Sequence, residues 1–326
     1  MGFSLSVERI FTVWFASLAA ALCLVLASLG LANQTIFTPT SPVKAYFKAL
    51  ADGDGERALS LLNTSLPAEN TSLISGQPLS ASLADLENLT ITTSHIDETG
   101  QKALVTASYR LDGQELSSDF YLSKSSSAWG IFDQWQLEPV ELPTIDLAAN
   151  TDSLILNDHT LALNQGERSV RVFFPGHYRA SLDPALFTGQ EKSLTLSSAS
   201  TQNPAMTLTA KPSQQATEDI KKQIAAELDQ CAAENTLYPT NCPFHYSFEG
   251  RVEGKVNWKI KEYPNPSLSL DNRGQWKLTA SKAVAEVSFT ELDLYTGKTW
   301  QVKEDVRFTY SANVSLEQGQ LVLSNG

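Results

Sequence analysis

The longest apolar stretch of the chain runs from Phe11 to Ala32, and no charged residue occurs between Arg9 and Lys44. A helix that crosses the hydrocarbon core of a bilayer needs about 20 such residues. The stretch therefore predicts a transmembrane signal anchor over residues 11–32, with lipid as its partner. Because Arg9 precedes it and residues 33–43 contain no Lys or Arg, the positive-inside rule predicts a cytoplasmic tail at 1–10 and an extracytoplasmic remainder.

Two other interpretations of this stretch stay open. A cleaved signal peptide would end at small residues, and Gly30-Leu31-Ala32 provides them, although the apolar run is longer than is usual for such peptides. A lipoprotein would need small residues just before Cys23, but Leu22 stands there. Cys23 is then most simply a residue of a helix in lipid.

Residues 33–41 form a polar spacer, after which Ser41-Pro42 predicts a helix start with a capping Ser and a Pro at the first helical position. The interruption Asp52-Gly53-Asp54-Gly55 divides the following apolar pattern into two short helices, and Ser82–Asn88 indicates a further short helical turn. The apolar stripe of the two helices comprises Val43, Tyr46, Phe47, Leu50, Ala58, Leu61 and Leu62.

The pattern then changes to alternation of period two, which is typical of strands. Asp112-Gly113 lies between two of these segments and is a hairpin signal. One or two helices followed by a curved antiparallel sheet predict an α+β cone over residues 42–139. Its four expected strands are Leu89–Ile96, Ala103–Leu111, Glu115–Ser123 and Trp129–Leu137.

Residues 144–200 show strand and loop patterns without a helical period and predict a small all-β sandwich module. Within it, Phe174-Pro175-Gly176-His177-Tyr178 resembles the turn of small β-modules of bacterial surface proteins, in which Pro-Gly reverses the chain and the Tyr re-enters the core. Residues 203–212 are interpreted as a linker to the next unit.

Residues 204–326 predict an α+β domain, which is interpreted as a second cone-like fold. Gln214–Glu234 has Ile220, Ile224 and Leu228 on one stripe with charges opposite, the pattern of an amphipathic helix. Tyr295-Thr296-Gly297-Lys298 predicts a hairpin turn. The expected strands are Tyr246–Ile260, Ser267–Leu270, Gln275–Thr279, Ala283–Leu294, Thr299–Tyr310 and Val314–Leu323.

Cys231 and Cys242 lie close in sequence on the expected extracytoplasmic side, where disulfides form. A disulfide bond between them is the favoured prediction. The alternative is a zinc site that includes His245, for which no fourth ligand is evident nearby. We therefore expect this chain to hold neither a metal ion nor a cofactor.

Composition narrows the classes of partner. Lys and Arg total 24 against 36 Asp and Glu, giving a net charge of −12, and Glu8 and Arg9 cancel, so the whole net charge belongs to residues 33–326. An acidic exported chain is a poor candidate for binding nucleic acid or anionic lipid.

The fold class expected is α+β multidomain: a transmembrane helix, a helix-plus-antiparallel-sheet cone, a small all-β module and a C-terminal α+β domain.

The sequence contains no P-loop, dinucleotide-binding or common hydrolase motif. The four histidines are spread over three units, and each is expected at the surface or in a turn. The cone is the best place for a pocket, since a His–Asp pair inside it could move protons. Its candidate residues are His95, Asp97, Tyr109, Asp133 and Trp135, against the alternative that Trp129 and Trp135 fill the cone and the polar residues face solvent.

Two segments carry a resemblance to known families. VKAYFKALADGDGERALSLL at the start of the first unit and AWGIFDQWQLEP at its end resemble the nuclear transport factor 2-like, cystatin-like cone of anchored bacterial envelope proteins. The domain order and the stretch Leu228–Phe244 resemble membrane-anchored proteins of high-GC Gram-positive bacteria and, more distantly, TcaA-like envelope proteins. The zinc ribbon that TcaA-like proteins usually carry before the anchor has no counterpart among the residues before Ile10.

The resemblance implies no particular activity, because cones of this kind serve as enzymes, ligand binders and spacers. The expected function is a non-enzymatic, membrane-anchored envelope protein that binds a cell-wall polymer or another envelope protein. The alternative is a ligand-binding or enzymatic cone.

Overall fold

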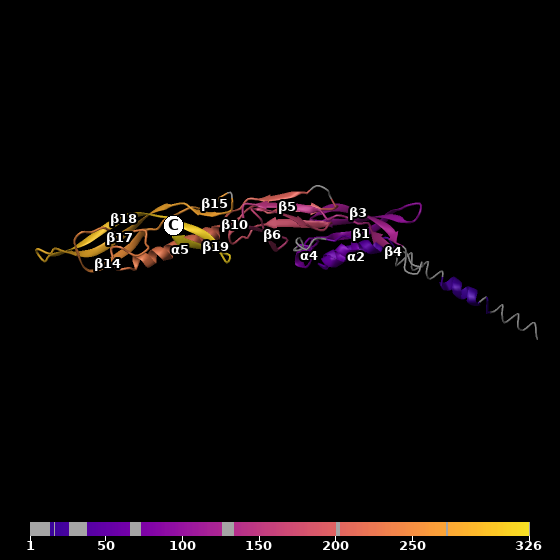
Figure 1. Cartoon of the computed structure of the whole chain (residues 1–326), viewed down its shortest axis with the longest axis horizontal. Coiled ribbons are helices and arrows are strands. Elements are labelled where there is room, and N and C mark those ends of the chain that lie inside the picture. Colours follow the sequence, from indigo (N-terminus) through magenta and orange to yellow (C-terminus); the bar gives the residue numbers. More distant parts are fainter. Residues whose placement is uncertain are drawn as a thin grey trace, which may run out of the picture.

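The computed structural model describes residues 14–15, 17–25, 38–65, 73–125, 134–199, 203–271 and 273–325. The chain is an α+β protein with several antiparallel sheets. The molecule is elongated, and it is described below in chain order as a first unit (residues 38–142), a second unit (143–212) and a third unit (213–325). The N-terminal helix lies at one end of the molecule, and the hairpin formed by residues 281–310 lies at the other (Figure 1).

Part of the apolar N-terminal stretch falls within the described residues. Residues 14–15 and 17–25 are helical, and Cys23 is exposed and unbridged. The remainder of 11–32 lies outside the described residues. No helix among the described residues is both long enough and apolar enough to span a bilayer. Large apolar side chains of this helix are exposed, namely Trp14, Phe15, Leu18, Leu22, Leu24 and Val25.

The first unit begins with helices α2 (Thr40–Ala51), α3 (Gly55–Leu61) and α4 (Gln77–Ala81). The break between α2 and α3 confirms the predicted interruption. The expected start of α2 was wrong: Pro39 occupies the cap position, and the Ser41 N–H already bonds to the Thr38 carbonyl at 3.0 Å, so Pro42 lies inside the first turn. The third helix precedes the predicted Ser82–Asn88 because Pro78 favours a helix start near Gln77.

Four antiparallel strands complete this unit in the order β1-β2-β3-β4, as predicted. At the hairpin between β2 and β3, Asp112 and Gly113 both have positive φ, 50° and 72°, as a tight two-residue turn requires. Residues 129–133 of the predicted fourth strand lie outside the described residues. The strands are β1 (Glu87–Ile96), β2 (Lys102–Leu111), β3 (Gln114–Ser125) and β4 (Gln134–Leu137).

The helices pack on the inner face of this sheet. Six of the seven predicted apolar stripe residues are buried, Leu61 being partly exposed. The Tyr46 ring lies 5.7 Å from Phe120 and 6.3 Å from Phe173 of the second unit, measured between ring centroids. Aromatic rings therefore form one core that spans the first two units.

The second unit contains short strands in three sheets. The orders are β11-β9-β6-β7, β12-β5-β8 and β10-β13, with β12 parallel to β5. Residues 203–212, interpreted from the sequence as a linker, instead supply β12 and β13 to these sheets. The strands are β5 (Thr144–Ala149), β6 (Ser153–Leu156), β7 (His159–Ala162), β8 (Glu167–Arg171), β9 (Gly176–Ser181), β10 (Phe187–Thr188), β11 (Lys192–Leu196), β12 (Ala205–Leu208) and β13 (Lys211–Pro212).

The segment from Phe174 to Tyr178 forms the predicted turn. The Phe174-Pro175 peptide bond is cis, and Tyr178 is buried with its hydroxyl donating to the Phe173 carbonyl at 2.6 Å. His177 lies in this turn, one of the two positions expected for the histidines, and it is buried: it is 4% exposed, and its Nδ1 lies 2.8 Å from the Thr195 hydroxyl. The antiparallel partner β11 and the first unit cover its ring.

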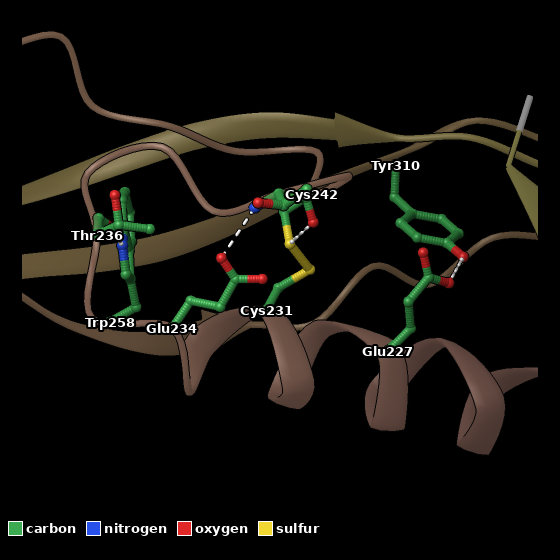
Figure 2. Close-up of a disulfide and its surroundings, with 8 residues drawn as sticks. Glu227, Cys231, Glu234, Thr236, Cys242, Trp258 and Tyr310 are labelled. Atoms are coloured by element: carbon green, nitrogen blue, oxygen red, sulfur yellow. Dashed lines mark hydrogen bonds between the residues drawn. A yellow bond between two sulfur atoms is a disulfide. The ribbon is translucent and has the colours of Figure 1, made fainter.

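The third unit begins with helix α5 (Gln214–Ala232), capped by the Ser213 hydroxyl, which accepts from the Ala216 N–H. The predicted stripe of Ile220, Ile224 and Leu228 is buried, as expected. Figure 2 shows how the end of this helix is held to the rest of the unit.

Cys231 in the last turn of α5 is bridged to Cys242, with the Cα atoms 5.8 Å apart, which confirms the predicted disulfide and excludes a zinc site at these thiols (Figure 2). The Glu234 carboxylate accepts from the Thr240 N–H inside the same loop. One turn earlier, the Tyr310 hydroxyl donates to the Glu227 carboxylate at 2.7 Å. These contacts fix α5 against the sheet that follows it.

The main sheet of this unit has the order β14-β17-β18, and the predicted Tyr295–Lys298 turn joins its last two strands. The predicted single strand Val314–Leu323 was wrong. It is a hairpin, because Gln318 and Gly319 both take positive φ and reverse the chain. The strands are β14 (Arg251–Glu262), β15 (Leu268–Leu270), β16 (Trp276–Leu278), β17 (Ser281–Leu292), β18 (Thr299–Tyr310), β19 (Ala312–Glu317) and β20 (Gln320–Asn325).

Candidate binding groove between the second and third units

The residues predicted for a cone pocket are spread over the first unit. His95 and Asp97 lie at the exposed end of β1. The Asp97 carboxylate accepts from the Thr99 hydroxyl at 2.5 Å and from the N–H groups of Gln101 and Lys102 at 2.8 and 2.9 Å. These bonds, with a smaller contribution from His95, lower the pKa of Asp97. The carboxylate therefore stabilises its own turn.

The other predicted pocket residues lie elsewhere. Tyr109 is buried, 6.0 Å from the Phe47 ring between centroids, and shares a 2.6 Å hydrogen bond with Ser118. Trp135 is half-buried on β4, at the opposite edge of the sheet from β1, with Lys124 Nζ 5.7 Å from its ring centroid. The described side chains do not converge. Asp133 lies outside the described residues, and a pocket in this unit stays a prediction.

A groove that the sequence did not indicate lies where the second unit meets the third. It consists of two adjoining cavities of about 470 and 550 Å³, which share Thr151, Asp152 and Arg273 in their walls. Cavities of this size are typical of ligand sites, and they often occur between domains. Its walls come from five chain segments: 149–153, 165–166, 183–187, 273–276 and 314–316.

A tight turn of the third unit forms one wall. The Asp271 carboxylate accepts from the N–H groups of Arg273 and Gln275, at 2.9 and 3.0 Å, and these bonds are the main reason why the pKa of Asp271 is lowered. Gly274 has φ 75°, and a Cβ there would lie 2.7 Å from the Asn150 carbonyl oxygen. Only glycine allows the two backbones to approach this closely.

The opposite wall is held by the side chain of Asn150. Its Oδ1 accepts from the Ala210 N–H at 2.7 Å, and its Nδ2 donates to the Ala210 carbonyl at 3.2 Å. These two bonds hold the segment that carries Thr151 and Asp152 to Ala210. Hydrogen bonds within the protein thus hold the backbone of both segments.

An aromatic pair lines the groove between these walls. The rings of Phe187 and Trp276 stack with centroids 5.3 Å apart and planes 18° from parallel. Phe187 is buried, whereas Trp276 is half-buried, so that part of the indole remains accessible. Leu186, Val314 and Leu316 extend this apolar surface.

Polar groups surround the aromatic surface. The side chains of Asp152, Arg273 and Gln275 are exposed and make no hydrogen bond or ion pair with any other described residue. One oxygen of Asp183 accepts from the Ala185 N–H at 2.9 Å. The groove thus offers hydrogen-bonding groups that solvent or a ligand must satisfy.

The described lining residues include no His, Cys or Lys. Among the described residues of the whole chain, no group of three His, Cys, Asp or Glu side chains is placed to hold a metal ion. The arrangement suits binding through stacking and hydrogen bonds.

Comparison of the chain with family models, with curated proteins and with solved structures finds no match in any of the three.

Proposed function

We propose that this chain is an extracytoplasmic binding protein, anchored in a membrane through residues 11–32, that holds a component of the cell envelope without chemically changing it. The observation that carries the proposal is a groove lined by polar groups that have no partner among the described residues. Its walls lie in the second and third units, and Figure 1 shows these units beyond the first unit from the apolar N-terminal helix. The first unit, with helices packed on four antiparallel strands, acts as a nuclear transport factor 2-like spacer in this proposal.

Two features support the location. The Cys231–Cys242 disulfide is of the kind that persists in oxidising compartments. The helical residues 14–15 and 17–25 expose apolar side chains, among them Trp14 at 69% and Phe15 at 73%, which water solvates poorly and lipid would cover.

Fractionation of bacterial cells that produce the full chain with a C-terminal tag tests the location. We expect the chain to stay in the membrane pellet after a carbonate wash, and the tag to be digested by protease added to intact protoplasts. Recovery in the wash or the medium, or protection of the tag, would contradict the proposal.

Matched variants sharpen this test. Leu22→Lys places a charge in the apolar segment, at a cost of about 3 kcal/mol if that position lies at the bilayer centre, and should reduce membrane retention. Leu294→Lys introduces the same change at a residue that is 76% exposed in the third unit, and should leave retention unchanged.

Co-sedimentation with isolated cell-wall sacculi tests binding and catalysis together. The full chain in detergent should sediment with sacculi and release no soluble fragments from them during long incubation. Time-dependent release of fragments would replace a binding role with an enzymatic one, and failure to sediment would remove the wall as the partner.

A further inference from the structure

The ligand class of the groove can be read from its lining, on the assumption that the proposed binding function holds. We propose that the groove binds a neutral glycan strand carrying N-acetyl groups, with one sugar ring stacked on Trp276. A pyranose ring presents a face of C–H groups and a rim of hydroxyls, and the groove has a surface for each.

The stacking surface is the indole of Trp276. Phe187 lies parallel behind it at 5.3 Å and is buried, so the indole is supported on one side and keeps its orientation. Aromatic side chains that are held rigidly and remain partly accessible are the usual anchors of binding sites. The accessible part of the ring fits the C–H face of a sugar.

The polar rim fits the hydroxyls. Asp152 and Gln275 have side chains without a partner among the described residues, and Asp183 uses one oxygen on the Ala185 N–H. Carboxylate and amide oxygens accept hydrogen bonds, and the Gln275 amide also donates. A ligand with many hydroxyls satisfies these groups, whereas an apolar ligand would leave them without water or partner.

The apolar surface continues beyond the indole to Val314 and Leu316, the latter 44% exposed. A bare sugar ring has nothing that requires this surface. The methyl of an N-acetyl group would pack on this apolar surface, and the amide of the same group can form hydrogen bonds with the polar rim. This extension favours an N-acetylated sugar over an unsubstituted one.

Charge and shape narrow the class further. The lining contributes two carboxylates, Asp152 and Asp183, against the single guanidinium of Arg273, so a polyanion would be repelled. The two cavities adjoin across Asp152 and Arg273 rather than forming one closed chamber. A strand lying along both cavities fits this shape better than a single small molecule.

Calorimetric titration of the full chain in detergent with a β-1,4-linked tetramer of N-acetylglucosamine tests the inference. Binding is expected, with weaker binding of the glucose tetramer that lacks N-acetyl groups. Trp276→Ala should abolish binding and Trp276→Phe should retain part of it. Trp300→Ala removes an indole that is 46% exposed outside the groove, and should have no effect.

Asp152→Ala tests the rim without endangering the fold, since this side chain makes no contact that the fold requires. A hydrogen bond to a charged group is lost, and we expect about tenfold weaker binding. Glu191→Ala removes an exposed carboxylate of the second unit outside the groove and should bind as the unaltered chain does.

The outcomes separate this inference from the proposed function. Sedimentation with sacculi but no binding of the N-acetylated tetramer overturns the glycan assignment and leaves the envelope-binding role, with a wall peptide as the next ligand to test. Binding that survives both Trp276→Ala and Asp152→Ala overturns the groove as the site. Equal or tighter binding of the glucose tetramer overturns the N-acetyl specificity.

Discussion

The hydroxyl of Tyr46 in α2 donates a hydrogen bond of 2.5 Å to the carbonyl oxygen of Phe174, 128 residues further along the chain. Tyr46 is completely buried, and Phe174 is 3% exposed. The bond joins the first helix of the first unit to the turn of the second. Among the described residues, the phenol of the neighbouring unit is the hydrogen-bond partner found for this carbonyl, which belongs to a buried residue.

Replacing Tyr46 by Phe should therefore destabilise both units together. The ring volume is kept, but the Phe174 carbonyl loses a hydrogen bond in a buried position, at a cost of about 1–3 kcal/mol. Urea denaturation monitored by tryptophan fluorescence measures the change. Tyr121→Phe, at a residue that is 61% exposed, is the control and should alter the unfolding free energy little. Equal effects of the two substitutions would argue against a role for the bond.

Alkaline pH should unfold the protein through the same core. Burial raises the pKa of Tyr46, Tyr109 and Tyr178 above the ordinary value of 10.0. A group whose pKa is higher in the folded state contributes stability that is complete below its unfolded pKa and is lost as the pH rises toward the folded value. The urea midpoint should hold steady near pH 8 and fall above about pH 10. The fall should be shallower in Tyr46→Phe; an identical slope would contradict this assignment.

Removal of the disulfide should lower the free energy of unfolding of the third unit by about 3 kcal/mol, because the bridge closes a short loop and restricts the unfolded chain. The double variant Cys231→Ser/Cys242→Ser is compared with the unaltered chain in urea. Reductant should destabilise the unaltered chain and leave the double variant unchanged. Because the two cysteines, 11 residues apart, are bonded to each other, a thiol reagent should label neither of them before reduction; labelling of both would refute the bridge.

The contribution of the close backbone contact between the third unit and the second can be tested by substituting Gly274. Gly274→Ala combines a positive φ with a Cβ 2.7 Å from the Asn150 carbonyl, whereas Gly297→Ala has a similar φ of 72° and no atom within 4 Å of the added Cβ. The strain of positive φ costs about 1–2 kcal/mol in each. Thermal unfolding should show a larger loss for Gly274→Ala, together with weakened ligand binding in the groove. Equal losses would show that the backbone contact contributes nothing.

Local patterns predicted the elements whose causes are local. The stripe of Ile220, Ile224 and Leu228 was enough to place α5, and Asp112-Gly113 was enough to place a hairpin. The disulfide followed from the proximity of two cysteines in the sequence. The start of α2 and the hairpin at Gln318-Gly319 were missed, because each depends on a turn whose residues carry a weaker signal than the apolar pattern around them.

The groove could not be predicted in this way. Trp276 and Asp152 are separated by more than a hundred residues, and neither lies in a motif. Residues 203–212 were interpreted as a linker because their own sequence does not show that they form a strand. The strand β12 forms by parallel pairing with β5, which lies far away in the sequence. One signal for the groove was available in the sequence: the composition of Asp271–Gly274 indicates a tight turn beside a tryptophan. Nothing in the sequence places this turn against Asn150.

The two junctions of the molecule differ in construction, and this has a mechanical consequence. The first two units share a cluster of buried aromatic rings, whereas the second and third share the single Phe187–Trp276 stack beside an open groove. If one end is held in a membrane and the other is pulled by an attached partner, we expect the second junction to bend first. A strand bound in the groove would then act as a splint across the weaker joint, and occupancy would stiffen the whole rod.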